Sequence, residues 1–174
     1  MKGRAVITFV ELRLSKKASN NLSYPALENY LTEHEITPSP ENIYDAVCAL
    51  RHSKLPDPSA IPNAGSFFKN PVITAPEYAL LKSRYPMMPS YEVSSEGGGR
   101  ELFKIPAAWL IDTLGFKGKS AGGIGVHDRQ ALVVVNPGHR TGEKILEFAR
   151  KIACSVEKEF NIDLEIEPQV WGLP

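Results

Sequence analysis

The chain has 174 residues, of which 43% are apolar and 23% charged, the composition of an ordinary globular protein. Its length allows one domain, or one domain with part of another. It is short for a complete two-substrate redox enzyme, because a flavin or dinucleotide domain alone commonly takes about 150 residues. Twenty Lys and Arg residues balance twenty Asp and Glu residues, so electrostatic binding to nucleic acid or to an anionic membrane is not expected.

The N-terminal third is predicted to contain one strand and one clear helix. Residues 5–14 are mostly apolar, with several β-branched side chains, which predicts a strand buried on at least one face. Residues 22–27 open a short helix or turn, and residues 40–52 form a longer helix with Ser39 as its N-cap. Apolar residues of the longer helix recur at helical spacing: Ile43, Val47 and Leu50. A proline-rich linker follows, so a domain boundary is expected near residue 56.

The middle of the chain is predicted to contain two further helices separated by a loop. A capping box formed by Thr74 and Glu77 begins the first of these helices. Residues 92–100 are rich in Gly and Ser and predict a mobile loop. Pro106 begins the next helix, and Gly115 is its expected C′ residue.

The C-terminal part combines a glycine-rich loop at 117–125, a strand at 131–135, a helix at 141–159 and a final strand at 162–166. The helix carries apolar residues on one face: Ile145, Phe148, Ile152 and Val156. Short strands are mixed with helices, and strand and helix do not alternate regularly. The sequence therefore predicts an α+β fold, a small domain of mixed short strands and helices.

No sequence feature points to export or to a metal site. Cys48 and Cys154 lie in helical stretches without a CxxC motif, and each is expected to be a small buried hydrophobic residue. The four histidines lack metal-ligand spacing. The opening segment resembles a signal peptide only superficially, because Glu11 and Arg13 interrupt its short apolar run. We therefore expect a cytoplasmic protein without a structural metal.

Two loops offer candidate chemistry, each with an ordinary structural alternative. Residues 118–125, beside Lys117 and Lys119, suit an anion-binding turn but lack the order of a P-loop or a dinucleotide-binding fingerprint, and a simple turn explains them as well. Ser66 has no nucleophile elbow. A fixed hydroxyl in a dry pocket can still give a proton to a strongly basic carbanion, and the flanking Phe67 and Phe68 can keep such a pocket dry. The alternative is an ordinary turn serine.

Several lysines and tyrosines lie close to proline or glycine rather than on long polar helix faces. The lysines suit a diphosphate, and the tyrosines suit stacking on a base or sugar. Solvated surface lysine and tyrosine packed on the core are the alternatives. The residues concerned are Lys54, Lys69, Lys104, Lys117, Tyr24 and Tyr91.

The string Asn-Ala-Gly-Ser-Phe-Phe-Lys-Asn-Pro at 63–71 resembles the signature loop of the UDP-N-acetylenolpyruvoylglucosamine reductase (MurB) family. Other segments resemble blocks of the same family and occur in the same order, so the resemblance covers nearly the whole chain. These segments are 51–58, 107–112, 117–118, 122–123, 126–127 and 130–133.

The resemblance implies an FAD-dependent reaction in cell-wall (peptidoglycan) synthesis. NADPH reduces the flavin, which passes hydride to C3 of the enolpyruvyl group, and protonation at C2 gives UDP-N-acetylmuramate. By the same resemblance, Ser66 matches the proton donor. The residues that match substrate contacts are Tyr24, Lys54, Asn70, Tyr91, Lys104 and Gln130.

Two departures from the family pattern stand out. The upstream FAD-binding region of the family is not in this chain, and residues 5–14 resemble its last strand. Gln169 stands where the family carries a glutamate that works opposite the serine, and an amide cannot supply an acid proton.

The expected organisation is therefore in three parts. Residues 1–55 are a remnant of the FAD-binding region, 56–160 the UDP-sugar-binding domain, and 161–174 a terminal strand that returns toward the flavin domain. A separate FAD-binding half is a possible partner. Two alternatives stay open: a non-catalytic UDP-sugar-binding module or remnant, and a generic phosphate-binding domain that uses residues 118–125.

Overall fold

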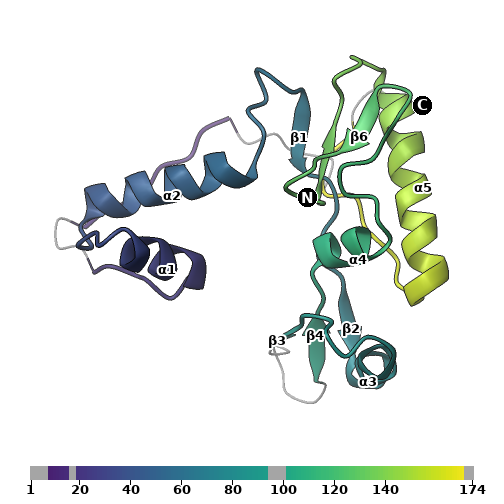
Figure 1. The fold of residues 1–174 in the computed structure, drawn as a ribbon, viewed down its shortest axis with the longest axis horizontal. Coiled ribbons are helices and arrows are strands. Elements are labelled where there is room, and N and C mark those ends of the chain that lie inside the picture. Colours follow the sequence, from purple (N-terminus) through teal and green to yellow (C-terminus); the bar gives the residue numbers. More distant parts are fainter. Residues whose placement is uncertain (1–7, 16–18, 94–100, 171–174) are drawn as a thin grey trace. The chain divides into compact units, whose positions relative to one another are not determined.

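A computed structural model describes residues 8–15, 19–93 and 101–170. The chain forms two compact units, Met1–Lys54 and Leu55–Pro174, and each is described by itself. Five helices and two small antiparallel sheets make up the described residues (Figure 1). The predicted α+β class is confirmed.

The first unit is a pair of helices, α1 (Pro25–Glu33) and α2 (Pro40–Lys54), which pack against each other. Ser39 caps α2 as predicted: its Oγ accepts a hydrogen bond from the Asn42 N–H at 3.1 Å. The helix continues two residues beyond the predicted end. Among the described residues of this unit, three apolar side chains form the buried core: Leu27, Leu31 and Ala46.

The predicted apolar face of α2 is only partly correct. Ala46 is the buried residue of this helix, whereas Val47 is 38% exposed and Ile43 and Leu50 are half-buried. The reason is that α1 covers only a narrow stripe of α2, and the residue on the centre of that stripe is the small alanine.

The predicted strand at 5–14 is wrong over its described part. Residues 8–14 have no strand structure, and the apolar side chains of Phe9 and Leu14 are 79% and 83% exposed. Residues 5–7 lie outside the described residues. A strand needs a neighbour for its backbone groups, and no described segment pairs with this one.

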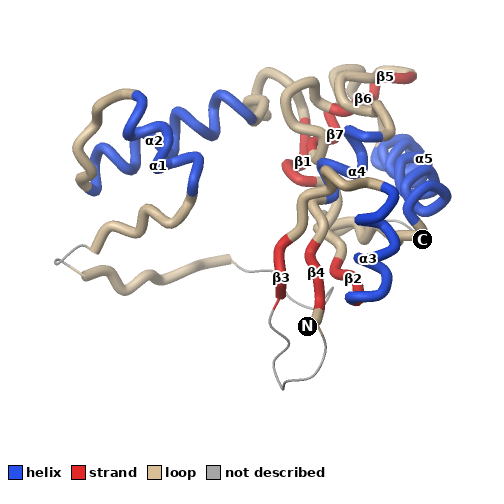
Figure 2. The backbone as a smooth tube through the Cα atoms, turned by 60° about the horizontal axis from the view of Figure 1, so that its bottom comes forward, coloured by secondary structure: helices blue, strands red, loops and turns tan. Residues whose placement is uncertain are grey.

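The second unit contains both sheets (Figure 2). The larger is antiparallel, and its strands in spatial order are β1 (Asn63–Ser66), β7 (Val133–Val135), β6 (Ile124–Val126) and β5 (Ser120–Ala121). The smaller has the order β2 (Val72–Thr74), β4 (Leu102–Lys104) and β3 (Tyr91–Val93). The predicted loop at 92–100 thus begins inside β3, and its remainder at 94–100 lies outside the described residues.

The glycine-rich loop at 117–125 is in large part a β-hairpin. β5 pairs with β6 across the two-residue turn Gly122–Gly123, whose φ angles are +61° and +87°. Glycine adopts this left-handed backbone without a steric penalty, which suits a tight hairpin turn.

Three helices complete the second unit: α3 (Ala75–Arg84), α4 (Ala107–Thr113) and α5 (Gly142–Phe160). α3 lies against the smaller sheet, and α5 packs on α4. Gly115 follows α4 with φ +69°, as expected for a C′ glycine.

The predicted buried face of α5 is confirmed at Ile152 and Val156 but is wrong by one position in the first turns of the helix. Its buried residues are Leu146, Ala149, Ile152, Val156 and Phe160. Ile145 and Phe148, both expected in the core, are only half-buried. Phe148 thus lies at the edge of the core rather than inside it.

The predicted final strand at 162–166 is reduced to a single bridge between Ile166 and Phe68. The Lys69 N–H donates to the Glu165 carbonyl at 2.9 Å, and the Glu167 N–H donates to the Phe67 carbonyl at 3.0 Å. Prolines follow the paired stretch on both segments and have no N–H to donate, so the ladder does not extend.

Two further observations concern the cysteines and the polarity of the helices. Cys48 is half-buried and Cys154 exposed, so the prediction of two buried cysteines is wrong for Cys154, which lies on the outer face of α5. Within the described ranges, the helices are all too short or too polar to cross a membrane.

The α3 capping box provides a pH-dependent contribution to stability. The Glu77 carboxylate accepts hydrogen bonds from the Thr74 Oγ1–H at 2.7 Å and the Thr74 N–H at 2.8 Å. These two bonds hold the pKa of Glu77 below its ordinary value of 4.5. A lowered pKa in the folded state stabilises the fold above about pH 4.5, and this contribution is lost as pH falls through the lowered pKa.

We therefore expect Glu77→Gln to lower the melting temperature at pH 7 and to have a smaller effect at pH 3, where more of the native carboxyl is protonated. Scanning calorimetry at both pH values measures the difference. Thr74→Ala is the matched variant: it removes the hydroxyl donor and should cost about 1 kcal/mol at pH 7. An equal loss from Glu77→Gln at both pH values would contradict the assignment.

Candidate functional site

Ser66 ends the edge strand β1 at an irregular point of the larger sheet. The register of β1 against β7 shifts between Asn63 and Ser66, which marks a β-bulge. Gly65 has φ +73°, and its N–H donates to Asn63 Oδ1 at 3.0 Å. Bulges of this kind re-aim a side chain and are common beside active sites. The local backbone thus fixes the direction of the Ser66 side chain.

The two phenylalanines after Ser66 do not surround its hydroxyl as expected. Phe67 and Phe68 are 5% and 1% exposed and pack into the core, whereas Ser66 is exposed. The rings of Phe67 and Phe68 are thus almost wholly covered by the core, whereas Ser66 lies at the surface. The two phenylalanines therefore anchor the segment that follows Ser66 to the core, and they do not exclude water from the serine hydroxyl.

Tyr91 and Lys104 are brought together by the smaller sheet. Lys104 on β4 lies directly opposite Tyr91 on β3 and opposite Val72 on β2. Residues directly opposite in a sheet project from the same face. The three side chains are exposed, so they form one solvent-facing row of a ring, an ammonium and an apolar group.

Asn70 has a structural bond in addition to its predicted role. Its Oδ1 accepts the Ala107 N–H at 2.9 Å, which satisfies one of the free N–H groups at the start of α4. The amide NH2 of this exposed side chain points away from that bond and can donate to a ligand. Asn70 therefore fixes the end of the signature string to α4.

Gln130 lies in the turn that leads into β7 and is half-buried. Its backbone carbonyl accepts the Val133 N–H at 3.0 Å, and its Oε1 accepts the Leu132 N–H at 3.4 Å. The Leu132 carbonyl in turn accepts the Phe67 N–H at 2.8 Å. Gln130 and Ser66 therefore lie at the same end of the β1–β7 pair.

Tyr24 and Lys54 belong to the first unit, and the other five predicted site residues belong to the second. Tyr24 directly precedes α1 and is 59% exposed. Lys54 is the last residue of α2 and is exposed.

The C-terminal segment runs antiparallel to the signature loop. Lys69 Nζ contacts Glu165 Oε1 at 2.7 Å, and the two residues face each other in the register of the Phe68–Ile166 bridge. Both side chains are about half exposed, so the pair contributes modestly to stability. Gln169 is exposed beyond this bridge.

His127 is a residue near the site that sequence reasoning did not single out. It is 6% exposed at the end of β6. Its Nε2 lies 3.4 Å from Asp128 Oδ1, and its Nδ1 accepts the Arg129 N–H at 3.3 Å. These contacts brace the turn that carries Gln130. The only sequence signal was its place in one of the blocks that resemble the reductase family.

The anion-binding interpretation of 118–125 is not favoured. Lys117 pairs with Asp112 at 3.1 Å. The Gly122 carbonyl accepts the Arg140 Nε–H at 2.7 Å, and the Gly123 carbonyl accepts the Gly138 N–H at 2.9 Å. An anion-binding turn needs several backbone N–H groups that point toward the anion, whereas in this hairpin turn the hydrogen bonds to Arg140 and Gly138 are made by the carbonyl groups.

Comparison with known protein families matches a single domain to almost the whole of the second unit. Residues 57–171 match the family model described as UDP-N-acetylenolpyruvoylglucosamine reductase, C-terminal domain. The chain belongs to this reductase family. Its second unit, with the bulged Ser66 strand and the Tyr91–Lys104 row, is the region matched by that domain.

Relatives named UDP-N-acetylenolpyruvoylglucosamine reductase align along almost the whole chain. The protein from Chromobacterium violaceum is 44% identical over 97% of this chain and 48% of its own length. The protein from Burkholderia ambifaria is 45% identical over 96% of this chain and 47% of its own length. The protein from Porphyromonas gingivalis is 44% identical over 92% of this chain and 46% of its own length. The chain spans about half the length of these curated relatives.

The glycine-rich turn at Gly122–Gly123 does not fit the diphosphate of a flavin. A flavin diphosphate needs a cradle of free N–H groups, typically at a glycine-rich turn before a helix. The glycine-rich turn at Gly122–Gly123 joins two strands and uses its carbonyls for internal bonds.

Proposed function

We propose that this chain is the substrate-binding part of a UDP-N-acetylenolpyruvoylglucosamine reductase and that it acts in the cytoplasm in peptidoglycan synthesis. We propose that FAD and NADPH act in the part of the relatives' length that this chain does not span. The single observation that supports this most is the pinned, bulged strand that presents Ser66 within the residues matched by the family model.

The polar residues of the second unit suit a UDP-sugar. The Lys104 ammonium supplies positive charge for a diphosphate, and the Tyr91 ring beside it offers a stacking surface. Asn70 and Gln130 add amide donors. On the family pattern alone, we propose that Tyr24 and Lys54 are also substrate contacts.

We propose that Ser66 is the catalytic proton donor. Reduction of the enolpyruvyl double bond adds a hydride to one carbon and a proton to the other. The Ser66 Oγ–H supplies the proton to the carbanion at C2, and the resulting alkoxide is reprotonated from solvent. A serine suffices because the carbanion is a far stronger base than an alkoxide.

A second candidate is a UDP-sugar-binding module without redox activity. It is favoured by Gln169, which stands where the family pattern has a glutamate. Gln169 lies three residues beyond Ile166, whose bridge to Phe68 joins the C-terminal segment to the signature loop. The amide can hydrogen-bond to a ligand there but cannot donate an acid proton.

Titration of the full chain with UDP-N-acetylenolpyruvoylglucosamine by isothermal calorimetry tests the binding proposal. We expect one saturable site, and Lys104→Ala should weaken binding about 10-fold or more, because a charge-assisted hydrogen bond contributes about 1.5–3 kcal/mol. Lys158→Ala, an exposed lysine on α5, is the control and should bind as the native chain does.

The proposal would be contradicted if the UDP-sugar bound neither to the chain alone nor to the chain with the FAD-binding half added. Inorganic phosphate that binds as tightly as the UDP-sugar would favour the generic phosphate-binding alternative. Visible absorption of the purified chain gives an independent check, since bound flavin at one equivalent would contradict the placement of FAD in a separate half.

A further inference from the structure

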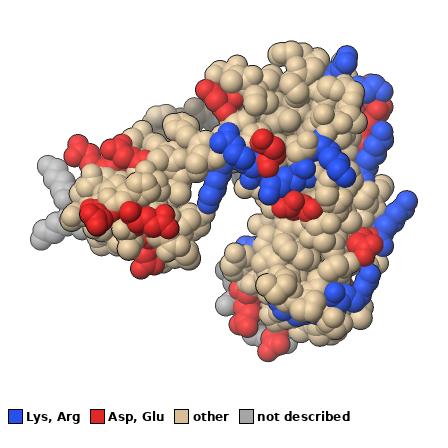
Figure 3. Space-filling view, in the orientation of Figure 1, with Lys and Arg blue, Asp and Glu red and all other residues tan. Residues whose placement is uncertain are grey.

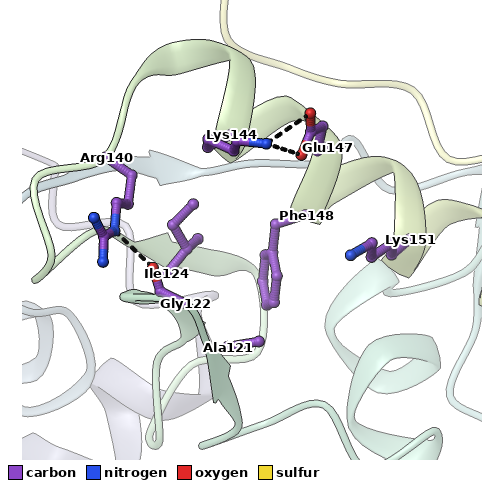
Figure 4. Close-up of a pocket in the computed structure, with 8 residues that line it drawn as sticks. All are labelled: Ala121, Gly122, Ile124, Arg140, Lys144, Glu147, Phe148 and Lys151. Atoms are coloured by element: carbon purple, nitrogen blue, oxygen red, sulfur yellow. Dashed lines mark hydrogen bonds and ion pairs between the residues drawn. The ribbon is translucent and has the colours of Figure 1, made fainter.

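A hollow of about 410 Å³ lies between the β5–β6 hairpin and the first turns of α5 (Figure 4). It is distinct from the candidate UDP-sugar site. β5 is the edge strand opposite to β1, which carries Ser66, and the Tyr91–Lys104 row belongs to the other sheet. None of the seven predicted site residues lines this hollow.

One wall of the hollow is rigid because two backbones meet closely. The Gly138 N–H donates to the Gly123 carbonyl at 2.9 Å, and a Cβ added at Gly138 would lie 2.8 Å from Gly123 Cα. Arg140 follows directly and is held at both backbone groups by Asn136, at 2.8 and 2.9 Å. Its Nε donates to the Gly122 carbonyl at 2.7 Å. The guanidinium is therefore fixed in place before any ligand binds.

The charged groups around the hollow are mostly cationic. Arg140, Lys144 and Lys151 line it together with a single carboxylate, Glu147. Both Glu147 oxygens accept from Lys144 Nζ, at 3.1 and 2.9 Å. Neither Arg140 nor Lys151 forms a salt bridge with a carboxylate among the described residues. The lining thus carries two positive charges in excess.

The base of the hollow is apolar and contains an aromatic ring. The Phe148 side chain extends from α5 toward Ala121 on the hairpin, with Ile124 beside it and Arg140 and Lys151 on either side of the ring (Figure 4). Phe148 is only half-buried, so part of its surface is open to a ligand. Lys and Arg side chains also gather along the edge of the second unit where α5 runs (Figure 3).

We propose that this hollow binds a small organic phosphate with a flat ring, a nucleoside monophosphate in size and chemistry. The ring packs on Phe148 and Ile124, and the phosphate is neutralised by the excess positive charge. A guanidinium and lysine ammonium groups together match the several acceptor oxygens of a phosphate better than they match one carboxylate. The volume lies in the range of pockets that hold small ligands.

Calorimetric titration of the full chain with adenosine 5′-monophosphate tests this inference, because a purine nucleotide avoids the uridine of the proposed substrate. We expect saturable binding with one site per chain. Lys151→Glu removes the excess charge and should weaken binding at least 10-fold. Lys158→Glu makes the same charge change on α5 outside the hollow and should leave the dissociation constant within about 2-fold.

Two further measurements distinguish this site from other sources of binding. Phe148→Leu keeps an apolar side chain but removes the aromatic ring. It should weaken the binding of adenosine monophosphate without changing the affinity for inorganic phosphate. Lys104→Glu, on the candidate UDP-sugar face, should not affect adenosine monophosphate binding.

Three outcomes would overturn the inference. The first is that adenosine monophosphate shows no saturable binding, and the second is that inorganic phosphate binds as tightly as the nucleotide. The third is that Lys104→Glu weakens the binding of adenosine monophosphate while Lys151→Glu does not. The last would mean that the nucleotide occupies the candidate UDP-sugar face. Failure of UDP-sugar binding with intact adenosine monophosphate binding would count against the proposed function alone.

Discussion

Replacement of Ser66 with alanine is expected to abolish reduction of the UDP-sugar while leaving the binding of that ligand nearly intact. The bulged end of β1 fixes the serine through Gly65 and Asn63, so the variant should fold normally. Loss of a positioned proton donor costs about 10²–10⁴-fold in rate. Loss of one neutral hydrogen bond weakens binding by about 10-fold at most. The two effects are therefore separable.

The assay uses the chain together with its FAD-binding half, with NADPH oxidation, product formation and substrate affinity followed separately. We expect flavin reduction by NADPH to be unchanged and product formation to be lost. Asn63→Ala is the matched variant for positioning, because it removes the Oδ1 that holds Gly65 and leaves the hydroxyl present. It should retain more activity than Ser66→Ala. Turnover of Ser66→Ala at the native rate would remove Ser66 from the mechanism.

Truncation of Ile152 to alanine is expected to lower the free energy of unfolding of the second unit by about 2–5 kcal/mol. Ile152 is fully buried at the middle of α5, within the core that joins this helix to α4 and the larger sheet. The loss combines the transfer of the removed atoms and the cavity that remains. Urea denaturation followed by circular dichroism measures the change.

Leu80→Ala is the matched control, because Leu80 is an aliphatic side chain of similar size on α3 that is 66% exposed. It should change stability by about 0.5 kcal/mol or less. Equal losses in the two variants would show that α5 does not pack on the core as described.

Local signals in the sequence predicted helix starts and stops well. The Ser39 cap, the Thr74–Glu77 box and the Gly115 stop each depend on residues within a few positions of one another, and the structure has all three. The signature string at 63–71 likewise pointed to a family that the comparisons confirm. Helix caps can be predicted from the sequence because the capping residue and the backbone groups that it satisfies lie within a few positions of each other.

Long-range pairing was predicted less well. Residues 8–14 have strand-like composition but no described partner, and 162–166 forms one bridge rather than a strand. The pairing of Tyr91 with Lys104 depends on two strands, β3 and β4, that were not predicted from the sequence. β-Structure is stabilised by neighbours that are distant in sequence, so composition alone does not decide it.

The sequence by itself determined the α+β class, the caps of several helices and the residue types of the candidate site. Only the tertiary structure decided that Ser66 is exposed on a bulged edge strand while Phe67 and Phe68 fill the core. It also left Phe148 half-buried beside Arg140, although periodicity assigned Phe148 to the core. The physical reason is that the buried side of a helix or strand is set by what packs against it, and a rotation of one residue changes which side chains remain available to a ligand.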